Sequence, residues 1–281
     1  MRLLAVFLLL CGLSGCSALR LAYDNADTYL RWRAGNYLDL RGEDADELDD
    51  RVQDLLAWHR VQVLPKYARL ADDAARRFAR GLSRQDLVWG YDSTMAQARE
   101  SLRAAAERVA PLLDRLTPEQ IVHLEQRFAE DNRKFARENL RGSEQERRQR
   151  RSKRTEERLE DWVGRLSASQ LERIGQYSNR APLLDDLRDR DRRRLQREVL
   201  EMLRAREAQK RLPELAGNWQ KGRGSAFVAA NEAWRQQLYA MALDIDQMLS
   251  PEQRARAVAQ LRRYAHDMRV LAARPAAHPA K

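Results

Sequence analysis

The sequence is poor in glycine, proline and cysteine, and after its first residues it has no long apolar run. It contains 12 glycines and 8 prolines among 281 residues, about 7% together, where roughly 12% is usual for soluble domains. This scarcity excludes collagen-like chains and argues against an all-β fold, which needs many turns. Hydrophobic residues make up 43% of the chain, enough to form a core, which disfavours general disorder.

The first sixteen residues resemble a bacterial lipoprotein signal. Arg2 precedes an apolar run from Leu3 to Leu13, which is too short for a mature membrane span but suits a signal-peptide core. The small residues Ser14 and Gly15 then lead to Cys16, whose thiol is the nucleophile that accepts a diacylglyceryl group in such proteins. The resemblance implies cleavage before Cys16, acyl chains on this residue and attachment to a membrane. The alternative is an ordinary secretory signal that happens to contain a cysteine.

The residue after the cysteine and the cysteine count refine this hypothesis. Ser17 stands where an aspartate favours retention in the inner membrane of this protein class, so we expect the periplasmic face of the outer membrane, with the inner membrane as the alternative. Cys11 would be removed with the signal, which leaves Cys16 as the only cysteine of the mature chain. An intramolecular disulfide is therefore excluded.

A five-residue unit of the form Leu-Ser/Thr-x-x-Gln/Asp occurs four times in the rest of the chain. It is typical of a helix start, where the hydroxyl of the Ser or Thr accepts a bond from a first-turn N–H and the acid or amide three residues later accepts one from the N–H of that Ser or Thr. The predicted capping pairs are Ser83 with Asp86, Thr117 with Gln120, Ser167 with Gln170, and Ser250 with Gln253. A degraded fifth copy covers residues 40–44.

Apolar residues at spacings of three and four follow each unit, and no segment alternates as a strand does. This pattern predicts an all-α fold of about ten helices, arranged as antiparallel hairpins or an elongated bundle. Helices are expected near 24–38, 44–63, 66–80, 84–114, 118–140, 144–165, 168–179, 183–211, 225–248 and 251–273, with a kink at Pro111 and a break over 213–224. The expected organisation is a signal peptide (1–15), a lipidated N-terminus with the first helix (16–40), a helical domain (41–273) and a flexible tail (274–281).

The repeated unit resembles the LTxxQ motif of the Spy/CpxP group of periplasmic proteins. Those proteins are small all-helical, cradle-shaped dimers that bind unfolded clients, so the resemblance implies client binding. This chain departs from them in being about twice as long and in carrying Arg41 where the motif has threonine. The overall layout, with tyrosine-rich segments at 23–32 and 36–40, also resembles a family of uncharacterised proteobacterial lipoproteins, which implies no particular chemistry.

Positive charge exceeds negative charge by ten and is concentrated in two stretches. The candidate surface for an anionic partner comprises Arg147, Arg148, Arg150, Arg151, Lys153, Arg154, Arg192, Arg193 and Arg194. A periplasmic location removes nucleic acid from the expected partners and leaves anionic phospholipid, lipid A phosphates, peptidoglycan carboxylates or acidic protein segments. The alternative is a solvated helix face with Glu–Arg pairs at spacing four, such as Glu144 with Arg148.

No pattern of catalytic or metal-binding residues is recognisable. None of the four histidines lies three or four residues from another, and we expect no metal or cofactor to bind. We expect His59, beside Trp58, to be a helix-surface or interface residue and not a metal ligand. The pair Glu100-Ser101 faintly resembles the catalytic Glu-Ser of lytic transglycosylases, without the rest of their motifs. We therefore expect a non-enzymatic, membrane-anchored binding protein, chaperone-like and with a protein partner or client. The alternatives are an assembly factor that contacts peptidoglycan or lipopolysaccharide and, third, a cell-wall hydrolase.

Overall fold

The computed structural model describes residues 17–274 and confirms the all-α class. Within this range the chain forms twelve α-helices, one π-helix and no strand. The α-helices are α2 (Ser17–Asp24), α3 (Ala26–Leu38), α4 (Glu43–Gln62), α5 (Leu64–Ala79), α6 (Arg84–Leu113), α7 (Pro118–Phe135), α8 (Glu144–Val163), α9 (Ala168–Arg180), α10 (Asp185–Arg204), α11 (Ala208–Gly217), α12 (Ser225–Gln247) and α13 (Pro251–Ala273). The π-helix η1 (Ala136–Leu140) continues α7. The predicted signal peptide, Cys16 and all but the first residue of the predicted tail lie outside the described residues.

Two predicted boundaries were wrong in the segment 183–217. The helix expected over 183–211 breaks into α10 and α11, because Arg206 adopts a positive φ of 54° and the carboxylate of Asp114 accepts hydrogen bonds from the backbone N–H groups of Ala208 and Gln209, at 2.6 and 3.0 Å. The break expected from Pro213 starts later, since α11 continues to Gly217 along the side of α6. Tertiary packing thus outweighs the local cost of a proline.

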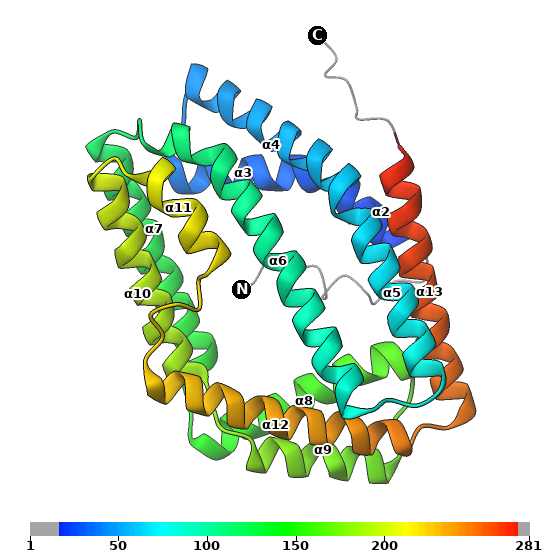
Figure 1. Ribbon diagram of the computed structural model, residues 1–281. Helices are drawn as coiled ribbons and strands as arrows, with labels where there is room; N and C mark the ends of the chain where they lie inside the picture. Colours follow the sequence, from blue (N-terminus) through cyan, green and yellow to red (C-terminus); the bar gives the residue numbers. More distant parts are fainter. Residues whose placement is uncertain (1–16, 275–281) are drawn as a thin grey trace.

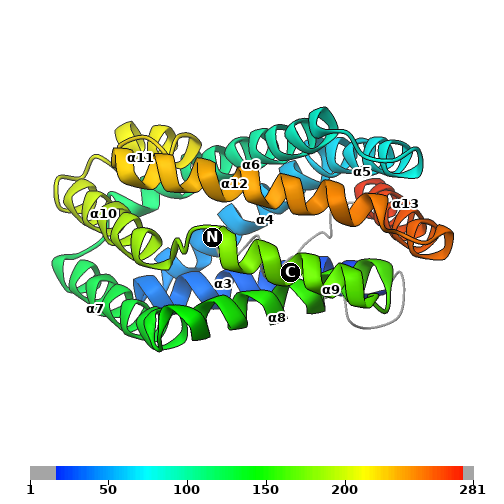
Figure 2. The same ribbon diagram turned by 90° about the horizontal axis from the view of Figure 1, so that it is seen from below.

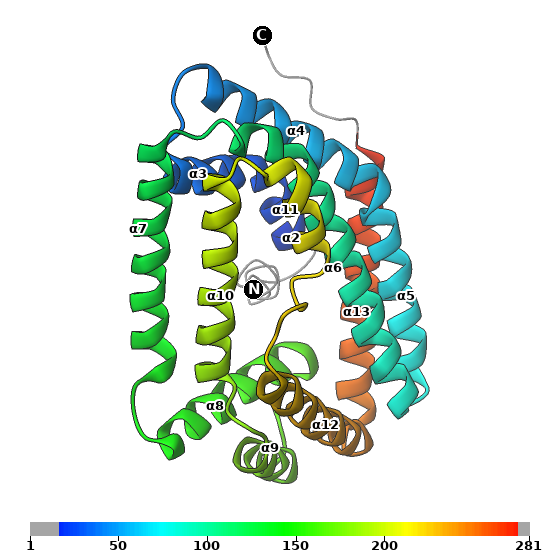
Figure 3. The ribbon, with the colours of Figure 1, turned by 60° about the vertical axis from the view of Figure 1, so that its left-hand side comes forward.

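The helices follow the sides of a four-sided frame (Figure 1). One side consists of α3 and α4, a second of α7 and α10, a third of α8, α9 and α12, and a fourth of α5 and α13, while α6 runs diagonally between two corners. Figure 2 shows two layers, with α5, α6, α11 and α12 in one and α3, α7, α8 and α9 in the other. Figure 3 shows α7 and α10 side by side along their length.

The hydrophobic core is divided among the sides and corners of the frame. Buried side chains form four separate clusters, of which the two largest centre on Leu124 and Leu203 at one corner and on Ile174 and Ile245 at another. Two smaller clusters pack α5 against α13 and α4 against α6. Among the described helices, none is long and apolar enough to cross a membrane.

All four predicted capping pairs form complete capping boxes. In each, the hydroxyl of the Ser or Thr accepts from the backbone N–H three residues later, and the acid or amide at that position accepts from the backbone N–H of the same Ser or Thr. The degraded copy forms no box, because the N-cap of α4 is Gly42, which has no side chain to cap with. A fifth box that the repeat did not reveal joins Ser143 and Glu146 at the start of α8.

Two of these boxes bind each other and join the starts of α9 and α13. The amide Nε2 of Gln170 donates to Oε1 of Gln253 at 2.9 Å, and Nε2 of Gln253 donates back to Oε1 of Gln170 at 3.2 Å. Each amide also donates to the carbonyl that precedes the other unit, Gln170 to Met248 at 3.2 Å and Gln253 to Arg165 at 2.8 Å. The capping unit is therefore also a reciprocal joint between segments 83 residues apart.

The other units make related contacts at their corners. Gln120 Nε2 donates to the carbonyl of Asp39, the residue just before the degraded copy, at 3.2 Å. The backbone N–H of Leu82 donates to Asp246 of α12 at 2.9 Å. Hydrogen bonds from Ser83 and Arg77 hold the pKa of the Asp86 carboxyl well below its usual range, so this box stays ionised at neutral pH.

The joint at Gln170 and Gln253 can be tested with a double-mutant cycle. We expect Gln170→Ala and Gln253→Ala each to lower the free energy of unfolding by about 1–3 kcal/mol, because each removes the bonds that the side chain makes to its own helix start, to the partner amide and to a carbonyl of the other unit. The double variant should lose less than the sum, with a coupling of about 0.5–3 kcal/mol, measured by urea denaturation. Gln120→Ala, in a more exposed box, is the matched control, and strictly additive losses would contradict the reciprocal joint.

Candidate functional site

The arginines predicted on α8 lie against the turn between α9 and α10. Arg148 donates to the carbonyls of Ser178, Asn179 and Ala181. Arg151 donates to those of Ser178, Ala181 and Pro182, the last at 2.8 Å. These carbonyls are exposed by the end of α9 and have no further helical partners. Both guanidinium groups therefore cap a helix end, and burial lowers the pKa of Arg151.

The remaining predicted residues on α8 divide into bound and exposed groups. Arg147 pairs with Asp186 of α10 at 2.8 Å, and Arg150 donates to the carbonyl of Arg141 at 2.5 Å. Lys153 and Arg154 are exposed. Lys153 Nζ lies 4.0 Å from a carboxylate oxygen of Glu157, which leaves Arg154 as the more available of the two.

The three predicted arginines on α10 are paired within their own helix. Arg192 and Arg193 donate to the two carboxylate oxygens of Asp189 at 2.8 and 2.7 Å. Arg194 pairs with Asp191 at 2.9 Å and with Glu198 at 3.1 Å. Glu–Arg and Asp–Arg pairs at helical spacing, the alternative considered for the basic stretches, describe this segment best.

The structure brings together three other arginines that the candidate surface did not include. Arg133, Arg137 and Arg141 line an open groove of about 440 Å³ whose other lining residues are Ala136 and Leu140. We call this the η1 groove. All three arginines are exposed, and no hydrogen bond or ion pair joins their guanidinium groups to another residue of the range 17–274. Their spacing of four was the sequence signal that could have revealed them.

The π-helix is part of this groove. It covers residues 136–140, between Arg133 and Arg141, and Arg141 itself is extended, with φ −73° and ψ 149°. A π turn is a strained insertion that occurs frequently at functional sites. An unpaired guanidinium presents a planar fork of donors that matches the oxygens of a phosphate or carboxylate. The η1 groove therefore has the donors and the apolar floor that an anionic amphiphile needs.

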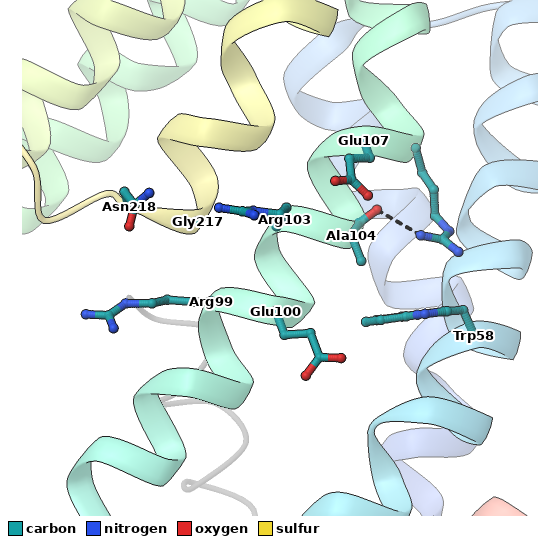
Figure 4. A pocket seen from close by; sticks show the side chains of 9 residues that line it. Trp58, Arg99, Glu100, Arg103, Ala104, Glu107, Gly217 and Asn218 are labelled. Carbon is teal, nitrogen blue, oxygen red and sulfur yellow. Dashed lines mark hydrogen bonds between the residues drawn. The ribbon is translucent and has the colours of Figure 1, made fainter.

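A second pocket lies where α6 meets α4 and α11 (Figure 4). It has a volume of about 400 Å³ and mixed charge, with Arg99, Arg103 and Arg108 beside Glu100 and Glu107. The side chains in Figure 4 come mostly from α6, with Trp58 on one side and Gly217 and Asn218 on the other. Opposite charges along one helix face neutralise each other, so this pocket has no strong preference for an ion of either sign.

The acid of the Glu100-Ser101 pair lines that pocket. Both oxygens of Glu100 accept from Lys66 Nζ, at 2.6 and 2.8 Å. A glycosidase acid must reach the leaving-group oxygen of a substrate, whereas both carboxylate oxygens of Glu100 are already bound to Lys66. This geometry gives the hydrolase hypothesis no support.

His59 lies in an aromatic cluster between helices. Tyr23 Oη is 3.1 Å from His59 Nδ1, and the rings of Trp58 and Tyr67 pack at centroid distances of 6.4 and 6.3 Å. Burial lowers the pKa of His59 from 6.5 to about 4 and raises the pKa of Tyr23 to about 12. His59 is thus an interface residue, and no cluster of metal-ligating side chains occurs in the part of the chain that the structure describes.

Residues 36–221 match the model of a protein family described as a family of unknown function (DUF6279). This is about two thirds of the chain. The chain belongs to this family. No curated protein and no solved structure matches it.

The DUF6279 match covers the candidate features unequally. It includes the η1 groove, the pocket of Figure 4 and the arginines of α8 and α10. It ends before α12 and α13, which supply one half of the reciprocal glutamine joint. Membership in this family fits the predicted uncharacterised family and assigns no activity to any of these sites.

The buried His59 predicts how stability depends on pH. In the unfolded chain this histidine takes up a proton below about pH 6.5, whereas in the folded protein it stays neutral down to about pH 4. Its contribution to stability is therefore complete above pH 6.5 and is lost as the pH falls toward 4, by up to about 3 kcal/mol. We expect His59→Gln to have the flatter profile of unfolding free energy over this interval. Parallel profiles for the two proteins would refute the effect, and His123→Gln is the matched control.

Proposed function

We propose that this DUF6279 protein is a lipid-anchored envelope protein that acts by binding and not by catalysis. Residues 1–15 would be removed as a signal peptide, and Cys16 would carry the acyl chains on the periplasmic side of the outer membrane. The support is the apolar run followed by Ser14, Gly15 and Cys16. Two or more acyl chains suffice for stable attachment, since each buried CH₂ contributes about 0.8 kcal/mol.

The helical body would bind an anionic component of the envelope. The observation that carries this proposal is the η1 groove, where three guanidinium groups without carboxylate partners surround an apolar floor. Phosphate is the favoured ligand group, because its oxygens match the guanidinium fork and because acyl chains beside it would contact Leu140. Lipid A and anionic phospholipid provide this chemistry, and peptidoglycan carboxylates provide a weaker version of it.

Client binding of the Spy type has less support. The larger exposed apolar side chains are distributed over several helices, as with Val61 on α4, Val122 on α7 and Val228 on α12. Single exposed apolar residues of this kind are ordinary on soluble proteins. The main argument for client binding is the resemblance of the capping units to the LTxxQ motif. In this structure, however, the units cap helix starts and join helices.

The lipid anchor is tested by labelling cells with radioactive palmitate. We expect the full chain to incorporate label and to sediment with the envelope, and Cys16→Ser to lose both, because the thiol is the acceptor of the lipid. Cys11→Ser serves as the matched control and should behave as the natural chain does. Unchanged labelling and processing of Cys16→Ser would overturn the anchor and return cytosolic polyanions to consideration.

The η1 groove is tested by binding of the soluble 17–281 chain to vesicles that contain lipid A or anionic phospholipid. Each arginine near an anionic surface contributes about 1 kcal/mol, so replacing Arg133, Arg137 and Arg141 by glutamine should weaken binding roughly a hundredfold. The matched control replaces Lys153, Arg154 and Arg158, which are equally charged and exposed.

The comparison separates a specific site from the net charge of the protein. A much smaller loss in the control supports the η1 groove, whereas equal losses in the two triple variants would mean that only the overall charge matters. Binding to peptidoglycan alone, with no affinity for either vesicle, would replace phosphate by carboxylate as the ligand.

A further inference from the structure

The first described helix begins one residue after Cys16 and is fixed to the body of the frame. Arg20 pairs with Asp267 of α13 at 2.5 Å, and the side chain of Asp267 is almost fully buried. Tyr23 is 5% exposed and contacts His59 of α4. No flexible spacer therefore separates an acyl group on Cys16 from the folded body, and the membrane surface and the frame must have a defined relation.

The two helices that follow Cys16 share an unusual exposed face. Leu21, Tyr29 and Trp32 are exposed to 64%, 39% and 59%, and we call them the outer stripe. Trp32 is the only exposed tryptophan among the described residues. The rings of Tyr29 and Trp32 lie 6.0 Å apart. The opposite face packs inward, with Leu30 and Ala34 against the α4–α6 cluster.

The outer stripe continues across the boundary between α2 and α3. The N–H of Asn25 donates to Leu21 and the N–H of Tyr29 donates to Asn25, at 3.2 and 3.1 Å, so helical hydrogen bonding passes through the break. The three stripe residues therefore lie on one side of a nearly continuous helical segment. The eleven helical steps from Leu21 to Trp32 span about 16 Å along such a segment.

This length allows an upright and a flat orientation of the segment on a membrane to be distinguished. If it stood upright, Trp32 would lie about 16 Å farther from the acyl chains than Leu21, beyond a headgroup region that is roughly 5–8 Å thick. If it lay flat, all three side chains would reach the headgroups together. Tryptophan and tyrosine prefer that layer, because their rings are apolar and their N–H and O–H groups are polar.

We propose that the outer stripe lies flat on the membrane that holds Cys16, with Leu21, Tyr29 and Trp32 in its headgroup region. The proposal rests on the lipid anchor proposed above and adds to it an orientation of the whole body. The helix α3, which carries two of the three stripe residues, lies in the same layer of the frame as α7 and α8 (Figure 2). Since the stripe begins five residues after Cys16, the occupant of this apolar face is lipid, and a second copy of the chain is the competing occupant.

The experiment couples the mature chain, residues 16–281, to vesicles through its one cysteine. The Cys16 thiol is linked to a maleimide-bearing phospholipid, and part of the remaining phospholipid carries bromine on its acyl chains near the headgroup. Bromine quenches tryptophan fluorescence on close contact. We expect clear quenching in the natural sequence and loss of most of it in Trp32→Phe, because Trp32 would be the one tryptophan of the six in contact with lipid.

The matched control is Trp219→Phe, which removes a half-buried tryptophan of the same chain and should keep the quenching. Equal quenching in the natural chain and in Trp32→Phe, or none in either, would overturn the proposal. A blue shift of Trp32 emission that follows protein density, without dependence on bromine, would overturn it in favour of contact between copies. The coupling is chemical, so its result is independent of acylation in cells, which palmitate labelling decides separately.

Discussion

The structure depends on side-chain capping at the corners of the frame. A helix start leaves four backbone N–H groups without partners, and a fold made of many helices with short connections has many such starts. Here the capping side chain at several corners serves two helices. The amides of Gln170 and Gln253 satisfy their own helix starts and bind each other, and Gln120 caps α7 while it contacts the end of α3. The side chains that cap the helix starts are thus also the ones that fix how neighbouring helices are arranged.

Most of the clustered arginines have a comparable structural task. Arg148 and Arg151 bind carbonyls at the end of α9, and the arginines of α10 pair with acids one turn away. A guanidinium has five donors and remains charged in proteins, so it can hold several carbonyls at once. A high content of arginine is therefore weak evidence for an anionic partner, and the groups without protein partners, as in the η1 groove, are the informative ones.

The sequence predicted what depends on neighbouring residues and missed what depends on distant ones. The four capping boxes were predictable because both members of each box lie three residues apart. The glutamine joint was not, because its halves are 83 residues apart. The division into α10 and α11 was missed because Asp114, far along the chain, binds the start of α11. Which arginines stay unpaired likewise depends on helices that meet only in the fold.

The pairing of α2 and α5 with α13 has a consequence for how the frame assembles. The Arg20–Asp267 pair joins residues 247 positions apart, so the partner of the earliest described helix is made almost last. During synthesis from the amino end, the apolar faces of α2 and α5 that pack against α13 stay exposed to water until α13 has been made. Contacts of such long range are slow to form and leave aggregation-prone intermediates. The packing of α13 against α5, which completes the fourth side of the frame, is therefore the folding step at which assistance during biogenesis would matter most.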